Sequence, residues 1–221
     1  MRPLTARRID HNSLAVTLMF VFEKNEFSNC DLQSVLRFVR CWERYYRGDD
    51  DLYSKALNVG GDLQEDGIIV LLRWKDPTYL NHPLKKNDEP NQRVIKVLEQ
   101  LPAINKFRSG SLSTSDYQSI TATLFPSGII WQLFLFHIAR PAEWPIADQH
   151  VFRAYSRLFS QQQPTSIDSF SSYKESFATL AGKLFEQASI DSTDPLAVVQ
   201  ARKRLDNALV AYGQFLKKYD F

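Results

Sequence analysis

Asp148 is the side chain in this sequence that is best placed for chemistry. It follows the apolar, proline-containing residues 144–147 and precedes a segment in which Val151, Phe152 and Tyr155 recur at helical spacing. An aspartate at such a boundary is a natural N-cap, because its carboxylate accepts hydrogen bonds from the first free amides of the helix. A rigidly held, ionised carboxylate can also stabilise positive charge that develops on a sugar ring. The residue types alone leave both roles open for Asp148.

The turn Pro-Ser-Gly at residues 126–128 is a second candidate site, because it joins two helical patterns. The backbone amides of Ser127, Gly128 and Ile129 would open the second helix, and the N-terminus of a helix is an anion site suited to a DNA phosphate. Gly128 has no side chain to keep a phosphate at a distance. The other interpretation is an ordinary turn between two helices.

Other residues with suitable chemistry lie before and after these two segments. Trp74 stands between Arg73 and Lys75, so it offers a stacking surface beside two charges that could contact phosphate. Alternatively, Trp74 is a core aromatic residue at the end of a helix. His137 lies on a strongly apolar segment, where a hydrogen-bonded core position is the alternative to a role in a base pocket. The predicted base-pocket residues are Trp74, Gln132, His137 and Gln149.

Residues 123–159 resemble the helix-hairpin-helix DNA glycosylase superfamily. The hairpin of that family is matched by Phe-Pro-Ser-Gly-Ile at 125–129, and its aspartate segment by Pro-Ile-Ala-Asp-Gln-His-Val-Phe-Arg at 145–153. The resemblance implies an all-helical fold, a catalytic role for Asp148 and phosphate contacts by the hairpin amides. The Arg-Trp-Lys segment at 73–75 is also similar to one that lies upstream of the hairpin in relatives of these enzymes.

Departures from the family pattern refine this expectation. The hairpin has one glycine where the family has two, and no lysine occurs between Lys106 and Lys174. Bifunctional members of the family carry a Schiff-base lysine shortly after the hairpin, so the resemblance implies a monofunctional enzyme that uses water. The four-cysteine motif of the iron–sulfur relatives is missing as well, so no cofactor is expected.

The resemblance therefore implies a DNA glycosylase that flips a modified or damaged base out of double-stranded DNA and hydrolyses its N-glycosidic bond. Its role would be DNA repair or defence against modified foreign DNA. The expected DNA-binding residues are Arg73, Lys75, Ser127, Gly128 and Ile129. A non-catalytic helical module that binds DNA or protein is the alternative, and the one-glycine hairpin favours it.

Composition sets wider limits on the protein. A chain of 221 residues with 44% hydrophobic content is expected to form a single domain over 1–221, with two packed lobes as a possibility. Its 27 basic and 25 acidic residues nearly balance, which does not exclude DNA binding. Two cysteines and four scattered histidines indicate neither a disulfide framework nor a metal site. Without a predicted signal peptide or membrane span, we expect a cytoplasmic monomer, nucleoid-associated if bacterial.

Hydrophobic periodicity predicts helices throughout, and therefore an all-α bundle of nine or ten helices with the hairpin and aspartate segment at 114–160. The run at 14–22 is expected to be a buried helix, with a strand as the alternative. Residues 78–90 are expected to form a loop, and Leu101-Pro102 should break or bend a helix. The last two helices are predicted at roughly 167–187 and 195–218, and helix caps at Asp148, Asp194 and one of residues 113–115.

Overall fold

The structure, a computed structural model, describes residues 32–48, 50–76 and 91–219. All regular structure in these residues is helical, with ten α-helices, one short 3-10 helix and no strand. The predicted all-α architecture is confirmed. The helix expected at 14–22 and the loop expected at 78–90 lie outside the described residues.

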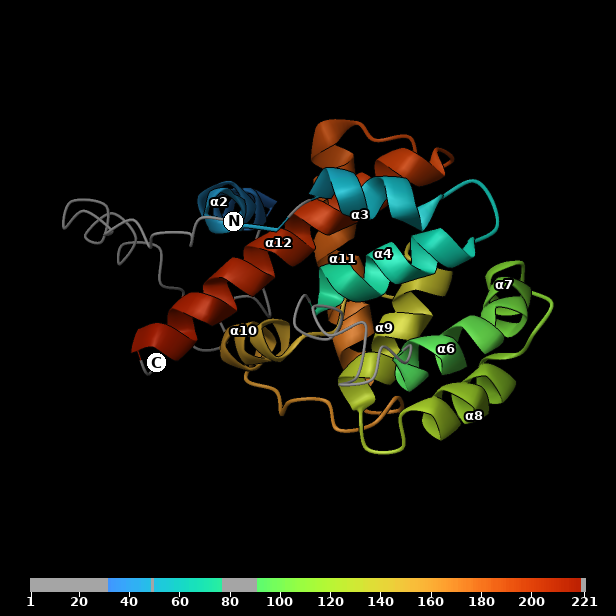
Figure 1. Cartoon of the computed structure of the whole chain (residues 1–221). Coiled ribbons are helices and arrows are strands. Elements are labelled where there is room, and N and C mark those ends of the chain that lie inside the picture. The colour runs from blue at the N-terminus through green and yellow to red at the C-terminus, as the bar shows by residue number, and fades with distance from the viewer. Residues whose placement is uncertain (1–31, 49, 77–90, 220–221) are drawn as a thin grey trace, which may run out of the picture.

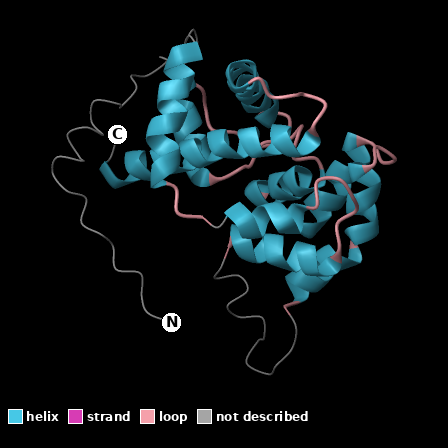
Figure 2. Ribbon diagram, turned by 90° about the horizontal axis from the view of Figure 1, so that it is seen from above, coloured by secondary structure: helices cyan, strands magenta, loops and turns pink. Residues whose placement is uncertain are grey.

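Figure 2 shows the described helices with the loops and turns between them. In chain order they are α2 (Leu32–Trp42), η2 (Glu43–Tyr45), α3 (Asp50–Leu57), α4 (Glu65–Lys75), α6 (Gln92–Glu99), α7 (Leu101–Arg108), α8 (Thr114–Leu124), α9 (Ile129–Ala139), α10 (Gln149–Phe159), α11 (Phe170–Ala188) and α12 (Pro195–Tyr219). None of these described helices is both long enough and apolar enough to span a lipid bilayer.

Local signals in the sequence set many of the helix ends. The side chains of Ser113, Asp148 and Asp194 accept hydrogen bonds from amides at the starts of α8, α10 and α12, as predicted. The break expected at Leu101-Pro102 is present: α6 ends at Glu99, and Leu101-Pro102 opens α7, because proline fits the first turn of a helix better than its interior. The helix expected from residue 167 begins at Phe170 instead, after a turn in which the Ser169 hydroxyl accepts from the Ser166 amide.

Helix α9 lies at the centre of the hydrophobic core. It is apolar on all sides, and its residues from Gln132 to Ala139 are all buried. A helix without a polar face must be covered all round, and α7 and α8 pack against one side of it. Figure 1 shows α9 behind α4 and among α7, α8 and α11. The buried apolar residues form one cluster that runs from Val35 on α2 to Leu216 on α12.

Helix α12 packs closely against α10 where it crosses the start of that helix. In Figure 1, α12 runs diagonally across the molecule with α10 beside it. A Cβ atom built on Gly213 would lie 1.9 Å from the carbonyl oxygen of His150. Only glycine therefore permits this contact. Gly213 thereby fixes the position of α12 against the turn of α10 that begins at Asp148.

Candidate active site around Asp148

Asp148 is the N-cap of α10. Its backbone is extended, with φ −151° and ψ 151°, and its Oδ1 accepts a 2.7 Å hydrogen bond from the His150 amide. The first helical bond follows at once, since the Phe152 amide donates to the Asp148 carbonyl oxygen at 2.9 Å. The predicted cap is confirmed. It occupies one carboxylate oxygen and leaves the other available for a second partner.

That second partner is Lys75, at the C-terminal end of α4. Its Nζ lies 3.2 Å from Asp148 Oδ2 and donates a 2.7 Å hydrogen bond to the Ala147 carbonyl oxygen. The Lys75 side chain is only 8% exposed, whereas that of Asp148 is 26% exposed. Lys75 was predicted as a phosphate contact, but its ammonium is turned inward onto Asp148. The pair joins residues 73 positions apart in the chain.

Electrostatics keep the Asp148 carboxylate ionised. Burial raises its pKa, but the charge of Lys75 and the hydrogen bonds from the His150 amide and Lys75 lower it by more. The net result is a pKa below the ordinary value for aspartate. A charged, oriented and partly accessible carboxylate at neutral pH is the main chemical feature of this site.

His137 occupies a buried, fully hydrogen-bonded position. Its Nδ1 lies 2.6 Å from the Trp144 carbonyl oxygen, and its Nε2 contacts the Tyr53 hydroxyl. The carbonyl can only accept, so Nδ1 carries the proton and Nε2 accepts from Tyr53. Burial lowers the pKa of His137 to about 3. The neutral imidazole thus anchors Trp144, at the start of the segment that leads to Asp148.

Trp74 and Arg73 differ in their surroundings although they are adjacent in the chain. Trp74 is partly buried, and its ring centroid lies 4.7 Å from that of Tyr53 and 6.3 Å from that of Phe134. The ammonium of Lys203 lies 5.1 Å from the same ring. Arg73 is exposed. Trp74 therefore belongs to an aromatic and cationic cluster beside Lys75, while Arg73 faces solvent.

The predicted hairpin forms a tight turn between α8 and α9. The Gly128 amide donates to the Phe125 carbonyl oxygen at 3.1 Å, and the same carbonyl accepts a 2.7 Å hydrogen bond from the Gln132 side chain. The Gln132 side chain therefore stabilises this turn. Ser127 is exposed, and Gly128 has an ordinary negative φ of −108°. The first amides of α9, at Ile129 and Ile130, have no partner among the described residues and open toward this turn.

The remaining predicted base-pocket residue, Gln149, is exposed on the first turn of α10. It adjoins Asp148 in the chain, and its side chain makes no hydrogen bond or ion pair with the described residues. The structure thus places Lys75 and Gln149 beside Asp148, and Trp74 next to Lys75 at the end of α4. Gln132 is bonded to the hairpin, and His137 to the backbone behind the site.

Helix α12 contributes a buried polar group of residues that sequence analysis did not identify. Arg202, Lys203, Asp206 and Asn207 are each no more than 6% exposed. Lys203 forms a 2.8 Å ion pair with Asp50, and Asn207 donates to the other oxygen of Asp50 at 2.6 Å. Most of α12 between Val198 and Leu216 is buried, and only a narrow stripe that includes Gln200, Arg204 and Gln214 is exposed. The sequence pattern is that of an amphipathic helix, so it gave no signal that these four polar side chains lie inside.

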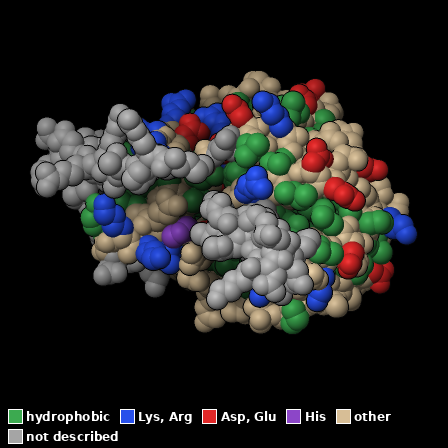
Figure 3. All heavy atoms as spheres, viewed as in Figure 1, with side chains coloured by type: hydrophobic (Ala, Val, Ile, Leu, Met, Phe, Trp, Pro, Cys, Tyr) green, Lys and Arg blue, Asp and Glu red, His purple; other side chains and the backbone are tan. Residues whose placement is uncertain are grey.

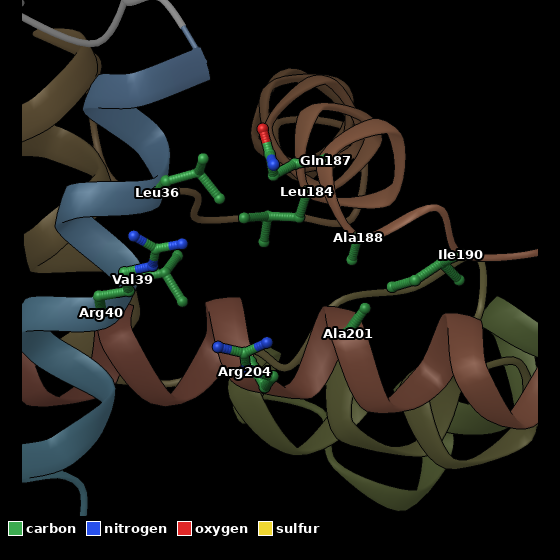
Figure 4. Close-up of a pocket in the computed structure, with 9 residues that line it drawn as sticks. All are labelled: Leu36, Val39, Arg40, Leu184, Gln187, Ala188, Ile190, Ala201 and Arg204. Atoms are coloured by element: carbon green, nitrogen blue, oxygen red, sulfur yellow. The ribbon is translucent and has the colours of Figure 1, made fainter.

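A separate cavity lies between α2, α11 and α12, as Figure 4 shows. Its volume is about 180 Å³, and the guanidinium groups of Arg40 and Arg204 point toward it. The apolar part of its lining consists of Leu36, Val39, Leu184, Ala188, Ile190 and Ala201. None of the predicted site residues lines this cavity.

No group of three or more His, Cys, Asp or Glu side chains suited to a metal ion occurs in the described part of the chain. Comparisons of the chain with models of protein families, with curated proteins and with solved structures find no match.

Proposed function

We propose that this protein is a monofunctional DNA glycosylase, which hydrolyses the N-glycosidic bond of a modified or damaged base in double-stranded DNA. The observation that carries the proposal is the setting of Asp148. Its carboxylate is ionised, 26% exposed and held by Lys75 and the His150 amide. The resemblance of residues 123–159 to glycosylases of the helix-hairpin-helix superfamily supports the same assignment.

The proposed chemistry needs one fixed negative charge. As the base leaves, positive charge builds up on the deoxyribose, and a carboxylate beside C1′ stabilises that charge. Asp148 can also orient or deprotonate the attacking water. A carboxylate oxygen has more than one acceptor site, so the contacts with Lys75 and the His150 amide leave room for a water or sugar atom. Lys75 and the helix cap hold the group still, which avoids reorganisation during the reaction.

Two surfaces would bring DNA to Asp148. The turn before α9 would hold a phosphate through its backbone amides, without regard to sequence. Helix α10 carries His150, Arg153 and Arg157 and no acidic residue. On the face shown in Figure 3, basic side chains flank a histidine on the left, whereas the right side has charges of both signs. Such local clustering suits a DNA-binding protein whose net charge is only +2.

Base recognition would use the candidate side chains that do not hold a backbone carbonyl group. Gln132 and His137 hold backbone carbonyl groups, so we assign them a supporting role in the proposed pocket. Trp74 offers an aromatic ring beside Lys75, and Gln149 offers an exposed amide next to Asp148. Stacking on Trp74 and hydrogen bonding to Gln149 are therefore the proposed contacts to a flipped base.

A non-catalytic DNA- or protein-binding module is the second candidate function. Two observations favour it: the hairpin has one glycine, and the capping role of Asp148 explains its position without any reaction. A screen of radiolabelled duplexes that each carry one modified base, followed by alkali to cleave abasic sites, separates the two functions. Strand cleavage of any duplex supports the glycosylase. Binding to duplexes without cleavage of any of them supports the module.

Borohydride trapping is expected to yield no covalent complex with a substrate duplex or an abasic duplex. Among the described residues, the amine recorded in contact with Asp148 is that of Lys75, whose ammonium is ion-paired with Asp148 and donates to the Ala147 carbonyl oxygen. An ammonium held in this way has no free lone pair for attack on C1′. The measurement is a gel assay of DNA after reduction. Trapping that disappears in the Lys75→Met variant would instead make Lys75 a nucleophile and the enzyme bifunctional.

Gly128→Asp is expected to weaken binding to any duplex by about tenfold or more, the size of a lost charge-assisted hydrogen bond. The new carboxylate would repel a phosphate at the start of α9 but would favour the helix dipole, so stability should not fall for electrostatic reasons. Gly128→Ala is the steric control, because it adds no charge and its Cβ would lie 3.3 Å from Phe125 Cβ and 3.7 Å from Trp131 Cβ and Cδ1. Binding is measured by fluorescence anisotropy. Weaker binding that is confined to duplexes with one particular modified base would contradict a phosphate contact at Gly128.

A further inference from the structure

Residues 146, 147 and 148, which lead into α10, each make a polar contact with a side chain of another helix. The Ile146 amide donates a hydrogen bond to the carboxylate of Asp206 on α12. The Ala147 carbonyl oxygen accepts from Lys75 on α4, and the Asp148 carboxylate contacts Lys75 and the His150 amide. The segment that carries Asp148 is therefore held from two sides, by a carboxyl group and by an ammonium.

Asp206 is the least exposed of these charged side chains, at 2%. The groups that face it come from every helix around it: Arg202 and Lys203 on α12, Lys75 on α4, Tyr53 on α3 and Tyr173 on α11. Its Oδ1 has no hydrogen-bond partner among the described residues. Burial raises the pKa of Asp206 to about 7, although the three cations lower it.

Packing alone does not explain an acidic residue at this position. Burying a carboxyl group in an apolar core is unfavourable unless a polar partner compensates it. The nearby residues Leu205 and Ala208, both fully buried, show that α12 accepts apolar side chains at this depth. The hydrogen bond that Asp206 makes goes to Ile146, two positions before Asp148. The contact between Asp206 and the Ile146 amide thus acts on the backbone that orients the Asp148 carboxylate.

We propose that Asp206 is a positioning residue for Asp148. Its hydrogen bond with the Ile146 amide fixes the backbone of residues 146–148 and so the position of the Asp148 carboxylate. The catalytic consequence rests on the proposed glycosylase function, but the positioning itself does not. Gly213 supports the arrangement, because its close contact with His150 sets α12 against the start of α10. Because α12 is held against α10, Asp206 has a defined position beside residues 146–148.

The test compares Asp206→Ala, which removes the hydrogen-bond acceptor, with Asp206→Asn, which keeps a side-chain oxygen. In Asp206→Ala we expect amide exchange of Ile146 to become at least about tenfold faster, since one hydrogen bond of about 1.5 kcal/mol is lost. We also expect the pKa of Asp148, followed by carbon NMR, to rise toward its ordinary value as the contact with Lys75 loosens. Asp206→Asn should restore both readouts to nearly wild-type values.

A second measurement uses the wild-type chain and does not depend on how the alanine variant folds. The Ile146 amide signal should titrate with the same midpoint as the Asp206 carboxyl group. Because the pKa of Asp206 is raised in the folded state, ionising this group opposes folding as the pH rises from 3.8 toward about 7. The melting temperature of Asp206→Asn minus that of wild type should therefore increase over this interval.

The outcomes separate the two proposals. If Asp206→Ala folds with unchanged Ile146 exchange and an unchanged pKa of Asp148, the positioning role is wrong. An Ile146 signal that does not follow the Asp206 titration is equally contradictory. If NMR bears out the positioning but wild type releases no base from any duplex, only the glycosylase function fails. If both hold, single-turnover base release in Asp206→Ala should fall about tenfold or more, the usual effect of a misplaced catalytic group, while DNA affinity is retained.

Discussion

Asp148→Asn is expected to fold and to bind DNA, but to release base at least about a hundredfold more slowly than wild type, as is usual when one well-placed electrostatic group is lost. The asparagine oxygen can still accept the hydrogen bond from the His150 amide and so cap α10. The negative charge that would stabilise the sugar cation is removed. Capping and catalysis thereby make different predictions for one substitution.

The ion pair with Lys75 adds a stability effect that a simple cap exchange lacks. In Asp148→Asn, the ammonium of Lys75 keeps its hydrogen bond to the Ala147 carbonyl oxygen but loses its counter-charge. The Lys75 side chain is only 8% exposed, so water compensates little for this loss. The pair is intermediate between an exposed one and a buried one, so we expect a loss of about 1–3 kcal/mol in the free energy of unfolding. Urea denaturation at neutral pH measures this value.

Lys75→Gln is the matched control, because it breaks the same ion pair and retains the Asp148 carboxylate. Single-turnover base release and melting temperature are measured on the same preparations, at a temperature where both variants remain folded. The catalytic interpretation expects Lys75→Gln to retain much more activity than Asp148→Asn at similar stability. Full activity of Asp148→Asn would reduce Asp148 to a helix cap and remove the main support for an enzyme.

Gly213→Ala is expected to lower the free energy of unfolding by about 3 kcal/mol or more, at or beyond the upper end of ordinary overpacking. The added Cβ would lie 1.9 Å from the His150 carbonyl oxygen and 2.5 Å from its carbonyl carbon. Both are backbone atoms, so relief requires α10 and α12 to move apart. The gain in helix propensity, about 1 kcal/mol, is too small to offset this. Any folded fraction should also release base more slowly, since His150 lies two residues after Asp148.

Gly182→Ala provides the control for this substitution. Gly182 lies within α11, and a Cβ atom there would meet nothing within 4 Å. Helix propensity then acts alone, so the variant should be more stable by about 0.5–1 kcal/mol. Thermal and urea unfolding of both variants give the comparison. Wild-type stability in Gly213→Ala would mean that α12 and α10 do not approach as closely as described.

The fold class was readable from the sequence because helices depend on local signals. Apolar periodicity identified α9, α10 and α12, and the caps at Ser113, Asp148 and Asp194 act over only two or three residues. Even the centre of the core was implied, since α9 has no polar side. Such features require no knowledge of how distant segments cross, so one sequence is sufficient to predict them.

The composition of the site could not be read in the same way. The sequence indicated Asp148 and, separately, Lys75, but gave no reason to pair residues 73 positions apart. It likewise left open whether His137 and Gln132 face a ligand or the backbone, and the structure gives each a carbonyl partner. On α12, the sequence pattern indicated an amphipathic helix, whereas the structure buries Arg202, Lys203, Asp206 and Asn207.

The sequence by itself therefore determined the helices, their caps and a carboxylate at the start of α10. Only the tertiary structure decided which charges meet that carboxylate. The physical reason is that periodicity records which side of a helix is apolar, whereas the partner of a polar side chain depends on where helices cross. Here that geometry is set by contacts such as Gly213 against His150, which bring α4 and α12 to the two sides of the segment that carries Asp148.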